Sequence, residues 1–276
     1  MDKISTSTNI SNNNIQKISI ILLSNMAATS VIYPLDNMRI KQYNNTKINY
    51  KLNELYQGFS LGLLRQITYG TPNIFIYSYL LSKYNKINKN ESSFYTKSIY
   101  GCISGSIGGL LGSPTELIML KKIQNNNKSI NIISLVKNKY NKEGLSSFFK
   151  GSFPTVIRSV LYNGSRLPIY SETKNKIVKY YPNIDNSIKL HVTSAIISST
   201  IGLIISNPFD VVKTRYQNIQ SNNIKLIDLF KKIIKEEGMR TFYKGFIPSF
   251  TKCIPHAIIS FTLLENLNSY YKINKL

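Results

Sequence analysis

The sequence is poor in the residues on which metal sites, disulfide frameworks and many active sites depend. Its 276 residues include no tryptophan, two cysteines, two histidines and only 13 acidic side chains. Cys102 and Cys253 are too few to build a disulfide framework and do not have the spacing of a metal site. His191 and His256 are too far apart along the chain to suggest a local metal site. We therefore expect no metal and no cofactor.

Motifs of catalysis are also missing, whereas positive charge is abundant. No glycine-rich phosphate loop and no nucleophile motif occurs, so we do not expect an enzyme and predict no catalytic residues. The 35 lysine and arginine residues give a formal net charge of +22, which indicates an anionic partner such as nucleic acid, a membrane surface or an acidic substrate. A soluble nucleic-acid-binding protein would fit the charge alone. The long base-poor runs described below argue against it, and we predict no nucleic-acid partner.

The beginning of the chain lacks the features of a targeting segment. Residues 1–15, MDKISTSTNISNNNI, contain neither an apolar stretch followed by a cleavage site nor an arginine-rich amphipathic pattern. The segment is polar and of low complexity, which is typical of a disordered tail. We therefore expect residues 1–16 to be disordered.

A short pattern occurs three times and divides the rest of the chain. Each copy has a proline and an acid two residues later. In two of the three copies a base follows five residues after the proline. An apolar segment with small residues four apart precedes each proline, as expected of closely packed membrane helices. The prolines are Pro34, Pro114 and Pro208, the acids are Asp36, Glu116 and Asp210, and the fifth-position residues are Arg39, Met119 and Lys213.

A second signal follows each copy of the first. The strings YQG, FKG and YKG end at Gly58, Gly151 and Gly245, and a base lies seven residues after each glycine: Arg65, Arg158 and Lys252. Long mixed runs follow, so each repeat contains two candidate helices joined by a basic loop. Each helix is about 20 residues long, which suffices to cross a hydrocarbon core of about 30 Å. We predict an all-α membrane protein with six transmembrane helices in three repeats, 17–90, 91–183 and 184–276, arranged with pseudo-threefold symmetry around a central cavity.

These two signals, each present three times, resemble those of the mitochondrial carrier family over roughly residues 17–272. Local strings such as GFSLGLLRQITYGT (58–71) and FPTVIRSV (153–160) look most like the oxoglutarate/malate and dicarboxylate carriers. Met119 supports this subgroup, because its members also have an apolar residue there. The resemblance implies a multi-pass monomer of the mitochondrial inner membrane that exchanges small anionic metabolites, with termini toward the intermembrane space and basic loops toward the matrix. It also implies cardiolipin near Gly58, Gly151 and Gly245.

The acids and bases of the first signal are predicted to form a matrix-side gate. Each proline bends its helix toward the bundle axis, so that charges of neighbouring repeats can pair in a ring. Because Met119 supplies no base, we expect at most two pairs between repeats, made by Arg39 and Lys213 with two of the three acids. The resemblance implies a second gate on the cytoplasmic side, for which the sequence offers one pair, Lys174 with Glu265.

The bases of the second signal are predicted to bind the transported anion. Seven residues of helix span about 10 Å, which places Arg65, Arg158 and Lys252 toward the membrane midplane. Such buried charges are costly unless they serve a function. Ser159 and Arg166 are added as neighbours on the same helix. Two departures from the oxoglutarate-like pattern, Asn73 and Lys252 in place of arginines, leave phosphate, sulfate, a tricarboxylate or an uncoupling-protein-like transport open as alternatives.

Overall fold

The computed structural model describes residues 2–43, 50–88, 92–124, 132–149, 151–181, 188–218 and 226–270. Within these ranges it describes side chains from residue 16 to residue 263, apart from Lys17 and Phe261. Every regular element in this part of the chain is helical. Five short elements lie between the long ones. They are α2 (Leu52–Leu55), α6 (Ile132–Glu143), η2 (Leu145–Phe149), α9 (Leu226–Glu237) and η4 (Met239–Tyr243).

Six long helical segments in the described residues form the body of the molecule. Three are continuous helices that each contain one of the repeated prolines, and two of the other three are interrupted near a predicted substrate residue. The segments are α1 (Asp2–Tyr43), α3 (Phe59–Arg65) continued by the π-helical η1 (Gln66–Gly70) and α4 (Thr71–Asn88), α5 (Phe94–Gln124), α7 (Ser152–Tyr180), α8 (Ile188–Asn218), and α10 (Phe246–Thr251) continued by α11 (Cys253–Tyr270).

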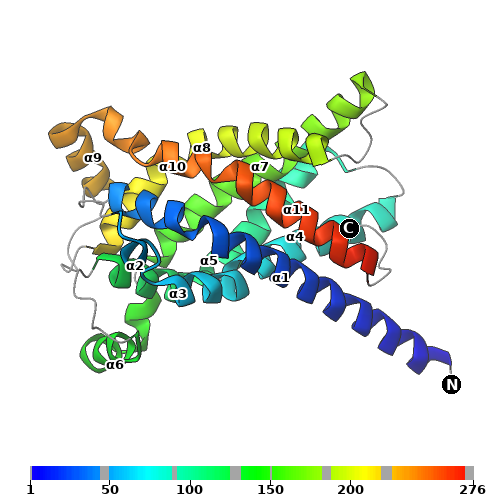
Figure 1. The fold of residues 1–276 in the computed structure, drawn as a ribbon, viewed down its shortest axis with the longest axis horizontal. Helices are drawn as coiled ribbons and strands as arrows, with labels where there is room; N and C mark the ends of the chain where they lie inside the picture. The colour runs from blue at the N-terminus through cyan, green and yellow to red at the C-terminus, as the bar shows by residue number, and fades with distance from the viewer. Residues whose placement is uncertain are drawn as a thin grey trace.

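The six segments close into a ring. Each packs against the next in chain order, and α11 packs against α1 to complete the circle. Helices α6 and α9 lie at one end of the molecule, whereas α1 begins and α11 ends at the opposite end (Figure 1). Two of these segments lie in each of the ranges 17–90, 91–183 and 184–276, apart from the start of α1.

Small residues allow α5 and α7 to approach closely. A methyl group on Gly101 would lie 2.6 Å from the carbonyl oxygen of Asn163, and one on Gly105 would lie 2.7 Å from the carbonyl oxygen of Ser159. No side chain fits at such distances, so the spacing of small residues in the second repeat is explained by direct backbone contact.

The beginning of α1 differs from the expectation for the tail. The sequence predicts disorder over residues 1–16, but the helix begins at Asp2. Asparagine, serine and threonine are poor helix formers, yet residues added to an existing helix need no new nucleation. The apolar part of α1 can therefore extend the helix into a polar segment.

Two ranges in the described residues have the length and hydropathy of membrane spans. Ile18–Tyr43 and Ile188–Gln217 are long and apolar enough to cross a membrane, and each contains an 18-residue stretch with a mean hydropathy of 1.6. The other long segments carry more polar side chains, several of which line the cavity described below. The mean hydropathy of the whole chain, −0.12, has the same origin.

Candidate gate and anion-binding cavity

The three repeated glycines lie where neighbouring repeats pack against each other. Gly58, Gly151 and Gly245 precede α3, α7 and α10 with φ angles of 82°, 87° and 76°, in the left-handed region that favours glycine. A Cβ on Gly151 would lie 2.6 Å from Gln217 of the third repeat, and one on Gly245 would lie 2.6 Å from Tyr43 of the first. These glycines therefore provide both a backbone conformation and room for a neighbouring helix.

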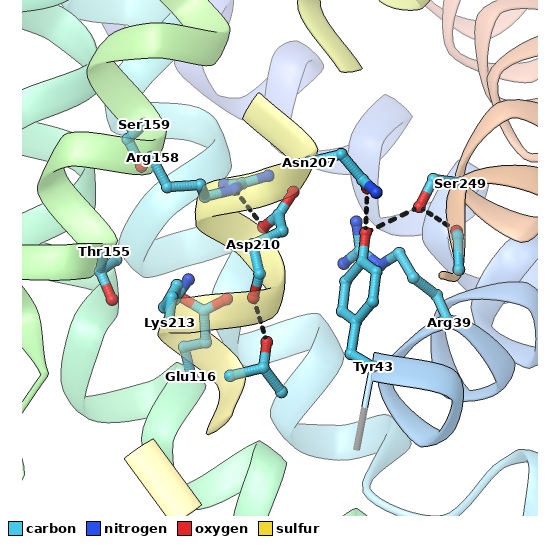
Figure 2. Close-up of polar contacts among 12 residues, drawn as sticks. Arg39, Tyr43, Glu116, Thr155, Arg158, Ser159, Asn207, Asp210, Lys213 and Ser249 are labelled. Carbon is cyan, nitrogen blue, oxygen red and sulfur yellow. Dashed lines mark hydrogen bonds and ion pairs between the residues drawn. The ribbon is translucent and has the colours of Figure 1, made fainter. Parts of the chain in front are cut away.

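Four ion pairs connect the repeated acids to bases. Lys213 of α8 contacts Glu116 of α5 with a nitrogen–oxygen distance of 2.6 Å. Arg158 of α7 donates to Asp210 of α8 at 2.7 Å (Figure 2). Asp36 of α1 accepts from Lys252, between α10 and α11, at 2.6 Å, and it forms an ion pair with Arg39 at 3.3 Å. A ring of charges thus crosses the bundle near the end where α9 packs.

The ring differs from the predicted gate in two respects. Arg39 contacts Asp36 on its own helix, so this pair does not connect two repeats. Two predicted substrate residues, Arg158 and Lys252, take part in the ring instead. The physical reason lies at Met119, which is 2% exposed and packs in an apolar cluster with Ile40, Leu61, Leu120 and Ile123.

A cavity of about 350 Å³ lies on the other side of this ring. Asp36 and Lys252 form its inner boundary, and its walls extend along the helices to His191, near the start of α8, and Ser260 on α11. Asparagine, serine, threonine and tyrosine side chains supply most of its polar wall. They are Ser24, Asn25, Thr29, Tyr69, Asn73, Tyr162, Asn163, Tyr170, Ser199 and Ser260.

Two cations in this cavity form no ion pair with the residues that the structure describes. Arg65 lies over the ring of Tyr69, with its guanidinium carbon 5.6 Å from the ring centre. Arg166 lies over Tyr162 at 5.3 Å, and its buried Nε has no hydrogen-bond partner in the described part of the chain. The cavity therefore brings together Arg65, Arg166 and Lys252, whereas Arg158 and Ser159 are buried outside its lining.

Comparison with known proteins identifies the family. The family model described as mitochondrial carrier protein matches residues 90–181 and 185–275. The 2-oxoglutarate/malate carriers of Caenorhabditis elegans and Bos taurus are 29% identical to the chain over 275 and 280 residues, covering 89% and 91% of it and 89% of each relative. The substrate carrier family protein ucpB of Dictyostelium discoideum is 32% identical over 229 residues, 79% of the chain and 77% of that protein. The chain belongs to the mitochondrial carrier family.

Membership confirms the family predicted from the repeated signals. Members of this family are transporters, and this carrier is a multi-pass protein of the mitochondrial inner membrane. The family model matches the second and third repeats, which both have a base before the glycine of the second signal and an acid–glycine pair upstream of it. The first repeat has Gln57 where the others have a base before the glycine, and it lacks the acid–glycine pair.

Sequence reasoning missed two residues, Tyr43 and Gln217, whose side chains connect neighbouring repeats of the carrier. The Tyr43 hydroxyl donates to Asn207 Oδ1 at 2.7 Å and lies 3.3 Å from Ser249 Oγ (Figure 2). Gln217 Nε2 lies 3.3 Å from Thr155 Oγ1. Tyr43, Ile123 and Gln217 all occur nine residues after the repeated prolines. The signal was therefore present, but the three residue types share no chemistry that would reveal it.

Asn73 is explained by an amide network in the carrier. Its Nδ2 donates to Asn163 Oδ1 at 3.1 Å, and Asn163 Nδ2 donates to the Tyr69 hydroxyl at 3.1 Å. Asn73 is 4% exposed, and a Cβ on Gly108 would lie 3.1 Å from it. The site is thus closely packed and polar but uncharged. Among the residues that the structure describes, Arg65 and Arg166 remain the cations of the wall without an ion pair.

The opposite end of the carrier contains a different polar contact from the predicted one. Lys97 of α5 donates to Ser171 of α7 at 2.8 Å and lies 3.7 Å from Glu172. Lys174 forms no ion pair with the described residues, and the side chain of Glu265 lies outside them. The predicted pair between Lys174 and Glu265 therefore stays a prediction.

Proposed function

We propose that this carrier exchanges small dianionic metabolites, with 2-oxoglutarate and malate as the first candidates, by alternating access. The observation that carries the proposal is the cavity behind the charge ring, in which Arg65 and Arg166 face the lumen without an acidic partner among the described residues. Two cations can neutralise a dianion, and guanidinium groups bind carboxylates through two parallel hydrogen bonds. The names of the relatives support the same substrates.

We further propose that the six long segments are six transmembrane spans, with α6 and α9 on the matrix side. The excess of lysine and arginine in the loops at that end agrees with the orientation expected from basic loops. The ring is then a matrix-side gate, and the structure represents a state closed toward the matrix. The cavity is open to the intermembrane space in this reading.

Anion binding can open the gate because Lys252 belongs both to the charge ring and to the wall of the cavity. Its ammonium group holds Asp36 in the ring and also borders the cavity. An anion that attracts Lys252 weakens this pair, and the adjacent pair of Arg158 with Asp210 is exposed to the same field. A ligand shifts a conformational equilibrium only by its differential affinity for the two states. A cation shared between gate and ligand supplies such a difference.

Lipid binding is proposed at the matrix-side helix starts. Gly58, Gly151 and Gly245 precede helices whose first N–H groups lack intrahelical partners, and such groups favour phosphate. A cardiolipin headgroup at these positions would lie where consecutive repeats meet. We propose that the carrier is a monomer, because the ring of six segments is closed within one chain.

The proposal is tested by exchange in proteoliposomes. Vesicles loaded with labelled malate receive external 2-oxoglutarate, phosphate, citrate, ATP or no anion, and the release of label is measured. We expect 2-oxoglutarate and malate to drive release and ATP to be ineffective. Release driven by phosphate or citrate alone would favour the alternatives raised by Asn73 and Lys252, and release driven by ATP alone would contradict the assignment.

A further inference from the structure

Both histidines of the chain border the same cavity. His256 lies on α11 one turn after Lys252, and its backbone N–H donates to the Lys252 carbonyl at 3.1 Å. Its Nδ1 lies 3.3 Å from Ser260 Oγ. His191 lies in the first turn of α8, with Nδ1 2.5 Å from the Tyr170 hydroxyl. Histidine is the side chain whose charge ordinarily changes near neutral pH. The anion cavity therefore holds two groups that can bind a proton.

While the cavity is empty, the charges around His256 disfavour a positively charged, protonated imidazole. Lys252 and Arg166 act on it from its own segment and from α7, and Asp36 acts from α1. The other titratable or charged groups that the structure describes in this wall are Arg65, Tyr69, Tyr162, Tyr170, His191 and Cys253. Asp36 is already shared by Lys252 and Arg39. The local balance of fixed charge is therefore positive.

A bound dianion reverses this balance. Two negative charges beside Arg65 and Arg166 neutralise the wall and stabilise an additional cation near the ligand, since opposite charges favour the charged form of a titratable group. Linkage requires the effect to be reciprocal, so a protonated imidazole must strengthen anion binding by the same factor.

We propose that anion binding is coupled to protonation of His256, so that the carrier takes up one proton with each bound dianion. The proton comes from the solution on the open side and binds an imidazole nitrogen, and it returns to solution when the anion leaves. The inference rests on the proposed exchange function and adds a protonic partner to the same site. His256 is chosen over His191 because Lys252, Arg166 and Asp36 all act on it, and Lys252 is itself part of the gate.

The first test is the pH dependence of affinity. The KM for labelled malate is measured in proteoliposomes with equal pH on both sides, between about pH 6 and 8, where malate carboxylates stay ionised. We expect the KM of the unaltered carrier to rise with pH, by up to about tenfold per pH unit. His256→Asn should have a KM that no longer depends on pH. His191→Asn, a matched change in the same cavity, should retain the dependence.

The second test counts protons directly and needs no variant. Purified carrier is titrated with malate in a calorimeter, in buffers with different ionisation enthalpies, at the alkaline end of the same range. Uptake of about one proton per bound malate is expected from linkage. Uptake near zero in the unaltered protein overturns the inference whether or not His256→Asn folds.

The outcomes separate this inference from the proposed function. Exchange of malate with a KM that is independent of pH leaves the function standing and removes the coupling. Proton uptake that persists in His256→Asn, or that is lost only in His191→Asn, contradicts the assignment to His256. Absence of exchange with malate, 2-oxoglutarate or phosphate at every pH overturns the proposed function itself.

Discussion

Asp36 and Lys252 should contribute unequally to the stability of the carrier, although they form one ion pair. Asp36 forms ion pairs with two bases, Lys252 at 2.6 Å and Arg39 at 3.3 Å. Lys252, in contrast, pairs with Asp36 alone among the acids that the structure describes. The Asp36→Asn change leaves two neighbouring cations without an acid. The Lys252→Met change leaves Asp36 paired with Arg39. The two substitutions therefore differ in what they leave behind.

The magnitudes follow from burial. The Arg39, Asp36 and Lys252 side chains are 7%, 12% and 18% exposed. Removing one partner of a buried pair costs about 3–5 kcal/mol when the other charge stays uncompensated. We expect Asp36→Asn to fall in this range and Lys252→Met to cost about 1–2 kcal/mol, since only one charge-assisted hydrogen bond is lost. The double variant should be more stable than Asp36→Asn, because one of the two stranded cations is gone.

Thermal unfolding in detergent, followed with a thiol-reactive dye, measures these differences. For a chain of this size a change of 1 kcal/mol shifts the Tm by roughly 2–4 °C. Exchange is measured on the same variants. Stability should recover in part in the double variant, but transport should not, because Lys252 also borders the cavity. Equal losses from the two single changes, or additive losses in the double variant, would refute the shared-cation reasoning.

Three further predictions concern other members of the site. Arg158→Ala should abolish exchange and also lower the Tm, because it strands buried Asp210, whereas a folded variant with near-normal transport would contradict its role in the ring. Gly151→Ala should destabilise the carrier by at least about 1–2 kcal/mol, and the control Gly144→Ala should destabilise it by less. Both glycines have a positive φ, but of the two only Gly151 lacks space for a Cβ. Thermal unfolding compares the two variants. Arg65→Ala should raise the malate KM at least about tenfold at an unchanged Tm, as measured by exchange kinetics.

The repeated signals made the architecture predictable from the sequence. Proline and acid recur at fixed offsets in all three copies, and a base follows in two of them. Each such string lies near the end of a helix, after an apolar segment with small residues. Three copies therefore specify helix order and indicate which ends of the helices meet. The left-handed glycines were also marked, because aromatic-x-Gly recurs at the start of each even segment.

The pairing of charges could not be predicted in the same way. Sequence offsets place Arg39 and Asp36 one turn apart, but they do not decide whether Arg39 contacts its own helix or the next repeat. Lys252 and Arg158 were expected to point into the cavity, since their depth is the same as that of Arg65. Which of these cations pairs with an acid depends on distances between helices, and the sequence carries no measure of them.

One departure in the repeat explains why Arg65 differs from its two counterparts. Arg158 reaches Asp210 of the following repeat, and Lys252 reaches Asp36 in the same cyclic sense. The equivalent acid for Arg65 is Glu116, but Lys213 already holds it at 2.6 Å. The base that should hold Asp36 in the manner of Lys213 is replaced by Met119, which packs among apolar side chains. Lys252 is therefore committed to the gate, whereas Arg65 lies over Tyr69 and faces the cavity. An apolar residue in the second repeat thus goes together with a cation in the first repeat that faces the cavity and has no ion pair among the described residues.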